Sequence, residues 1–87
     1  MKNKVLVKII VPEIDSSYDV FIPVNEIMWK VKRLIFKVIA DSSGIAIDKN
    51  IECILMNKST CKIYGNNEII INTDIRNGTE LLVISKM

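Results

Sequence analysis

One stretch of this sequence has the periodicity of a helix, and the segments on either side of it are rich in β-branched residues. Within residues 26–40, apolar side chains recur at spacings of three and four, as on the buried face of an amphipathic helix. Asn25 is expected to cap this helix, and Gly44 to end it in a left-handed conformation. The predicted core stripe of the helix consists of Ile27, Val31, Leu34, Ile35, Val38 and Ile39.

Strands are predicted before and after the helix. The first β-branched run ends at Pro12, and a few turn-forming residues separate it from the second run, which predicts a hairpin. Asn77 and Gly78 form a strong turn signal before the last run. The predicted strands are residues 5–11, 18–24, 51–56 and 80–85; residues 61–64 could add a short strand, and residues 69–74 could be strand or loop.

The order of these elements defines a fold class. It is β-β-α-β-(β)-β, which predicts an α+β domain with a mixed sheet and one helix packed across it. The chain has 87 residues, of which 49% are hydrophobic. That length supports one hydrophobic core, so we expect residues 1–87 to form a single domain.

The charge and the cysteines exclude several classes of protein. Twelve basic and ten acidic residues give a net charge of +2, which is too small to indicate nucleic acid as the main partner. Lys8 interrupts the first apolar run, so neither a targeting sequence nor a transmembrane segment is expected. Cys53 and Cys61 are interpreted as reduced thiols of a cytoplasmic protein.

The sequence also lacks the usual equipment for catalysis. It contains no histidine, which removes the commonest general base and metal ligand. Two cysteines cannot complete a four-ligand zinc site, and three isolated glycines do not form a phosphate-binding loop. We therefore expect a protein that is not an enzyme and has no catalytic residues, cofactor or metal.

Two passages of the sequence resemble ubiquitin and its relatives. Residues 18–35 (YDVFIPVNEIMWKVKRLI) resemble the passage from the second strand into the helix, and residues 73–84 (TDIRNGTELLVI) resemble the turn and last strand. In this resemblance Ile75 is a buried residue of the turn. The ending is most similar to that of the bacterial stand-alone YukD-like (EsaB-like) proteins, through Ile75, Asn77, Gly78 and Leu81. The resemblance implies a ubiquitin-like β-grasp fold and an accessory or regulatory role in type VII (WXG100/ESX) secretion.

The last residues of the sequence differ from those of ubiquitin-type modifiers and sulfur carriers. Those proteins end in Gly-Gly because their C-terminal carboxylate must be activated and then attacked, whereas this chain ends Ile84-Ser85-Lys86-Met87. Conjugation and sulfur transfer are therefore not expected. A relative of these carriers that has lost the Gly-Gly, and a structural subunit of a larger complex, are the alternatives.

Alternation along the strands predicts a binding surface. Each strand carries a charged residue that is expected to face solvent, and its alternating neighbours share that outer face of the sheet. The side chains predicted to point inward are Val7, Ile9, Cys53, Leu55, Leu81 and Val83. Those predicted to bind a protein partner on the outer face are Leu6, Phe21, Ile54, Leu82 and Ile84, with Ile10 and Met56 on the same side. A wrong strand register, or a loop over this face, is the alternative.

The helix predicts a second surface. Trp29 and Phe36 are placed on the side opposite the core stripe, among basic residues, and two exposed aromatics would suit a protein contact. A homodimer through either surface is one option. Alternatively, Trp29 packs on a loop and Phe36 lies under the connection at 45–51. The basic side chains are typical of a solvated face, with an acidic partner or anionic lipid as the alternative; they are Lys30, Lys32, Arg33 and Lys37.

Overall fold

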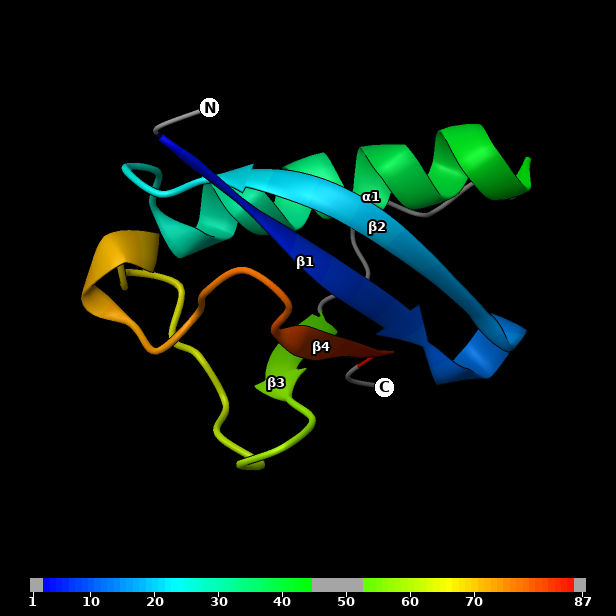
Figure 1. The fold of residues 1–87 in the computed structure, drawn as a ribbon. Coiled ribbons are helices and arrows are strands. Elements are labelled where there is room, and N and C mark those ends of the chain that lie inside the picture. Colours follow the sequence, from blue (N-terminus) through cyan, green and yellow to red (C-terminus); the bar gives the residue numbers. More distant parts are fainter. Residues whose placement is uncertain (1–2, 45–52, 86–87) are drawn as a thin grey trace.

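The structure is a computed structural model that describes residues 3–44 and 53–85. In this part of the chain, four strands form one sheet in the order β2-β1-β4-β3, and one α-helix lies across a single face of it (Figure 1). The elements are β1 (Lys4–Val11), β2 (Ser16–Pro23), α1 (Met28–Ser43), β3 (Cys53–Asn57) and β4 (Glu80–Ser85), with the short 3-10 helices η1 (Pro12–Ile14) and η2 (Ile70–Asn72).

The sheet is mixed. β1 pairs antiparallel with β2 and parallel with β4, and β4 pairs antiparallel with β3. The two central strands are therefore the parallel pair, and the helix between β2 and β3 makes the crossover that parallel strands require. The α+β fold predicted from the sequence is confirmed.

The hairpin between β1 and β2 follows from local chemistry. Pro12 starts η1, where its fixed φ suits the first helical position. Asp15 then takes a left-handed conformation with φ of 50°, which aspartate tolerates better than most residues. Its N–H donates to the Pro12 carbonyl at 3.1 Å, and the chain reverses into β2.

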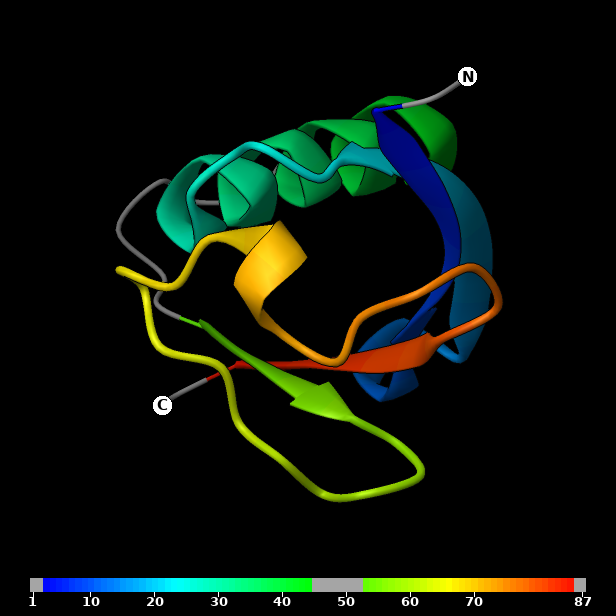
Figure 2. The ribbon, with the colours of Figure 1, turned by 60° about the vertical axis from the view of Figure 1, so that its left-hand side comes forward.

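The start of the helix differs from the prediction. The N-cap is Ile27, without a side-chain cap, and Asn25 lies outside the helix. Backbone carbonyls of the later chain satisfy the first helical donors instead: the Met28 N–H donates to Glu68 O at 2.8 Å, and the Trp29 N–H to Asn66 O at 3.2 Å. A polar cap is unnecessary because a distant segment lies against this end of α1 (Figure 2).

The end of the helix agrees with the prediction. Gly44 ends it in the left-handed region, with φ of 72°, and its N–H donates to the Ala40 carbonyl. The helix continues beyond residue 40 to Ser43, so its last turn is longer than predicted.

The core lies between α1 and the inner face of the sheet. Val7, Ile9, Leu55, Leu81 and Val83 are at most 5% exposed, so the predicted inward alternation is confirmed. Ile75 is buried as the ubiquitin resemblance implied. On the helix, the most buried positions are Met28, Val31, Ile35 and Ile39; Met28 was not predicted, whereas Ile27, Leu34 and Val38 are only half-buried.

The chain between β3 and β4 is mostly irregular. Residues 61–64 contain one isolated bridge, from Ile63 to Met56, in place of the short strand considered from the sequence. The ambiguous segment 69–74 contains the 3-10 helix η2. The predicted connection at 45–50, and the predicted start of the third strand at 51 and 52, lie outside the described residues.

Candidate protein-binding surface

The outer face of the sheet, turned away from α1, holds a cluster of apolar side chains on three neighbouring strands. Strand pairing places Leu82 of β4 between Ile10 of β1 and Met56 of β3, and sets Ile84 beside Ile54. All five side chains are half-buried. We call this cluster the outer patch: Ile10, Ile54, Met56, Leu82 and Ile84.

Leu6 and Phe21, also predicted for this surface, lie apart from the outer patch. They are opposite each other on β1 and β2, and they are 38% and 54% exposed. The two are exposed as predicted. They form a separate apolar pair near the β2 edge of the sheet.

A row of charged residues separates this pair from the outer patch. Lys8 of β1 lies between Asp19 of β2 and Glu80 of β4 in the strand register. The row continues to Lys58, whose Nζ lies 3.9 Å from a Glu80 carboxylate oxygen. The single surface predicted from alternation is therefore divided into two apolar regions.

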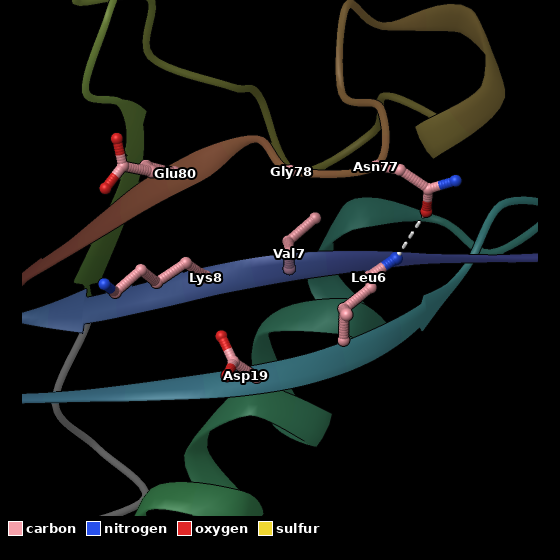
Figure 3. A pocket seen from close by; sticks show the side chains of 7 residues that line it. All are labelled: Leu6, Val7, Lys8, Asp19, Asn77, Gly78 and Glu80. Carbon is pink, nitrogen blue, oxygen red and sulfur yellow. Dashed lines mark hydrogen bonds between the residues drawn. The ribbon is translucent and has the colours of Figure 1, made fainter.

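The charged row also borders a shallow hollow of about 530 Å³ (Figure 3). Asn77 and Gly78 of the loop before β4 form one side, and their contacts with β1 fix the shape. The Leu6 N–H donates to Asn77 Oδ1 at 2.8 Å, and the Gly78 N–H to the Leu6 carbonyl at 2.8 Å. Gly78 has φ of 88°, which glycine adopts without strain.

The two helix aromatics have different environments. Trp29 is 40% exposed, with the Lys30 ammonium 5.5 Å from the centre of its ring. Phe36 is half-buried and packs against the core, because it lies on the flank of the helix next to the buried stripe. The expectation that both are exposed side by side is therefore corrected, and Phe36 is omitted from the candidate surface.

Two of the basic residues on the helix have partners within the protein. Lys32 Nζ donates to the Cys53 carbonyl at 3.2 Å and to Asn66 Oδ1 at 2.7 Å, which ties α1 to β3. Lys30 Nζ lies 3.8 Å from a Glu26 oxygen one helical turn earlier. Part of the basic charge therefore supports the fold.

Three exposed apolar residues were not predicted. Ile63 and Ile71 are 54% and 57% exposed, and Ile69 is 37% exposed. They lie in the irregular chain between β3 and β4, where neither strand nor helix periodicity applies, so no sequence signal indicates their orientation. Ile63 adjoins the outer patch through its bridge to Met56 and extends its margin.

The titratable groups inside the protein serve packing. Tyr64 is 1% exposed, donates to Asp74 Oδ1 at 2.5 Å and accepts from Asn57 Nδ2 at 3.2 Å. Burial, reinforced by the Asp74 carboxylate, raises the pKa of Tyr64 to about 12. Burial also raises the pKa of the Cys53 thiol, which disfavours the reactive thiolate.

The described residues contain neither a cluster of metal ligands nor a helix long and apolar enough to span a membrane. Among them, no group of three or more acidic, cysteine or histidine side chains is placed to hold a metal ion. The only α-helix that the structure describes, α1, is too short and too polar to cross a bilayer.

Comparison with solved structures identifies the fold. The ubiquitin-like domain of EccD5 from Mycobacterium xenopi superposes with a TM-score of 0.75 at 13% identity, covering 95% of this chain and 94% of that one. A chain of the MycP5-free ESX-5 inner membrane complex also gives 0.75 at 13% identity, covering 97% of this chain. This protein spans only 21% of that chain. The fold is therefore ubiquitin-like, the β-grasp architecture expected from the sequence.

The same fold occurs in proteins of other kinds. A chain of the toluene 4-monooxygenase HD complex superposes with a TM-score of 0.71 at 8% identity, covering 95% of this chain and 99% of that one. No family model matches the sequence, and the search of curated proteins found no match. Function must therefore be argued from the surface of the molecule.

Proposed function

We propose that this protein is a non-catalytic, protein-binding module of a type VII (ESX) secretion assembly, and that the outer patch contacts another protein of that assembly. In this proposal the 87 residues act as one accessory domain in the cytoplasm. The observation that carries it is the outer patch itself: five apolar side chains from three strands lie together on the sheet face away from α1. Contiguous apolar surface on a small protein commonly marks a contact site.

Two further observations support the proposal. Two of the residues that bear potentially reactive groups, Tyr64 and Cys53, are buried, and burial raises the pKa of each, whereas the Cys61 thiol is exposed. The fold matches the ubiquitin-like domain of EccD5 over nearly the full length of both chains, which favours an ESX setting for a domain of this size and shape.

The test begins with the genes beside the one that encodes this protein. We expect a secretion ATPase and WXG100 proteins among their products, and capture of one of these products on co-expression. The variant Ile54→Asp with Leu82→Asp places two carboxylates in the outer patch and should reduce capture at least about tenfold, since burying an unpaired charge is costly. The measurement is copurification followed by titration of the purified pair.

The control is Ile71→Asp, which places one carboxylate at a 57% exposed apolar residue on η2, outside the outer patch. It should bind like the wild type. If the aspartate pair unfolds the protein, Ile54→Ala with Leu82→Ala removes the same contacts without burying charge. A folded alanine variant that binds at full strength would exclude the outer patch as the contact surface.

A second candidate is a structural subunit of a larger complex, as the similarity to a chain of the monooxygenase complex suggests. The outer patch would then be covered permanently. Sedimentation at increasing concentration separates this candidate from the first one, because a protein that is stable and monomeric when purified alone does not need a permanent cover.

A further inference from the structure

The two edges of the sheet differ in the contacts that the rest of the described chain makes with them. At the β3 edge, the Tyr64 N–H donates to the Leu55 carbonyl at 3.1 Å, and the Asn57 N–H to the Lys62 carbonyl at 2.8 Å. Lys32 Nζ donates a hydrogen bond to the Cys53 carbonyl. The chain after β3 therefore folds back and covers this edge, as proteins commonly protect exposed strands.

The β2 edge can be analysed from the hydrogen bonds of β1. The Lys8 N–H donates to the Thr79 carbonyl at 3.0 Å, and the Gly78 N–H to the Leu6 carbonyl. The backbone groups of Leu6 and Lys8 thus face the β4 side. Because these groups alternate along a strand, those of the intervening Val7 face β2.

Strand register extends this result to β2. Val7 is paired with Val20, so the backbone of Val20 faces β1, and the residues on either side of it face the opposite way. Asp19 and Phe21, and by the same alternation Ser17, direct their N–H and C=O groups to the outside of the sheet. Within residues 3–44 and 53–85, β2 has a strand neighbour on the β1 side only.

The charged side chains on the outer face form a row that reaches this edge of the sheet. From β3 toward β2, the row runs Lys58, Glu80, Lys8, Asp19, with alternating sign. It ends on the carboxylate of Asp19 on β2, the edge strand of the described sheet. Opposite charges on adjacent strands stabilise a sheet, so a cation on an added strand would continue the alternation. Two residues further along β2, Phe21 would face an apolar side chain.

The inner side of the same edge is apolar. Lys32 bonds to β3, so the flank of α1 that carries Lys32 faces the β3 side. Leu34 and Val38 lie about 200° and 240° further round the helix and are half-buried. They occupy the flank nearer β2, which α1 contacts. Residues of an added strand that point inward would meet this apolar flank.

A second copy of β2 suits this edge poorly. A twofold antiparallel pairing centred on Asp19 would place two carboxylates directly opposite each other, and like charges in that position are destabilising. Sliding the second copy of β2 by two residues in either direction places Asp19 opposite Phe21 or Ser17. Neither register supplies the missing cation.

We propose that the outer edge of β2 binds an extended segment of a partner protein as an additional strand, with a lysine or arginine opposite Asp19 and apolar residues opposite Phe21 and on the inner side. The main-chain ladder supplies affinity, and the alternate side chains supply specificity. This site is distinct from the outer patch, and it does not depend on the secretion setting.

The test uses the peptide acetyl-TVVKVT-amide. In the antiparallel orientation its lysine lies opposite Asp19, and the valine two residues earlier lies opposite Phe21. On titration, we expect shifts in the NMR spectrum along β2 and slowed hydrogen exchange at the N–H groups of Ser17, Asp19 and Phe21. Contact through side chains alone would not slow these three amides.

Charge reversal gives the specificity control. Acetyl-TVVEVT-amide should bind more weakly than the lysine peptide by up to about fivefold, as expected for one cross-strand charge pair. The variant Asp19→Lys should reverse this order. N-methylation of the lysine peptide at its second and fourth residues should abolish binding, whereas methylation at the third and fifth, which face away from β2, should preserve it.

Several outcomes would overturn the proposal. These are a failure of the lysine peptide to bind at the limit of its solubility, equal binding of both peptides to the wild type and to Asp19→Lys, or shifts confined to β3 and β4. Protection of the three amides that rises with protein concentration, without peptide, would show that a second copy occupies the edge. The Ile54→Asp, Leu82→Asp variant, if folded, should bind the peptide normally, which separates this test from that of the outer patch.

Discussion

The two faces of the sheet carry the same kinds of side chain in different environments. On the inner face, Leu55 and Leu81 are fully buried under α1, whereas their sequence neighbours Ile54 and Leu82 on the outer face are half-buried. The helix covers one face of the sheet. Apolar residues on the covered face therefore stabilise the fold, and those on the other face remain accessible for contact. Side-chain type alone does not distinguish these two roles.

The largest difference in stability between the two faces is expected from substitutions at two adjacent residues of β3. We expect Leu55→Ala to lower the free energy of unfolding by about 2–5 kcal/mol, because it leaves a cavity in the core. Ile54→Ala should cost about 1–2 kcal/mol, since part of that side chain already contacts water. Chemical denaturation of both variants measures the difference. Equal costs would mean that the outer face is packed as tightly as the core.

A polar contact buried beside β3 should have a smaller effect on stability. Tyr64→Phe removes a buried hydroxyl that bonds to Asn57 and Asp74. We expect a loss of about 1–2 kcal/mol in the free energy of unfolding, since Asp74 is exposed and can be solvated. Asn57 Nδ2 loses the hydroxyl as its acceptor, which accounts for much of this cost, whereas Asn57 Oδ1 still accepts from the Ser59 N–H at 2.9 Å.

The same hydroxyl gives this prediction a pH signature. The pKa of Tyr64 is about 12 in the folded protein, against 10.0 for an ordinary tyrosine, so folding favours the protonated phenol. Its contribution to stability is complete below pH about 10 and is lost as the pH rises from about 10 through 12. The difference in the free energy of unfolding between the wild type and Tyr64→Phe, measured across this pH range, separates this contribution from the titration of the lysines. A constant difference up to pH 12 would contradict the assignment.

The inner face was predictable from the sequence because burial repeats with the period of the strand. A charged residue in each strand, such as Lys8 or Glu80, shows which side faces water, and the alternate positions follow. The helix stripe was predictable for the same reason. Two differences remain. Leu34 and Val38 are only half-buried, and Met28 is buried because the chain at Asn66 and Glu68 lies against it, a long-range contact without a local signal.

The outer face was predictable residue by residue, but its division was not. Alternation places Leu6 and Leu82 on the same face, yet their distance across the sheet depends on the pairing of β1 with β4. That pairing sets Lys8 beside Glu80 and inserts the charged row between them. Register between distant strands is determined by the whole fold. The exposed Ile63 lies in irregular chain and Ile71 in the three-residue helix η2, and neither segment is long enough to show a period.

The smallest effect on stability is expected from the charged row itself, with Lys8→Leu. The substitution removes a positive charge that the strand register places between Asp19 and Glu80, and an opposite charge across neighbouring strands contributes about 0.2–1 kcal/mol. Part of this loss should be offset, because leucine places apolar surface beside Leu6 and Ile10 on the same strand face. We therefore expect the free energy of unfolding to change by no more than about 1 kcal/mol.

The effect of Lys8→Leu on association should be larger than its effect on folding. The substitution joins the Leu6–Phe21 pair to the outer patch, and continuous apolar area promotes self-association. Sedimentation velocity should show more oligomer for Lys8→Leu than for the wild type at equal concentration. Lys8→Gln removes the same charge but keeps a polar side chain, and it should sediment like the wild type. If both variants associate equally, it is the charge of Lys8 that limits self-association, through repulsion between molecules. The division of the apolar surface into two regions would then not limit it.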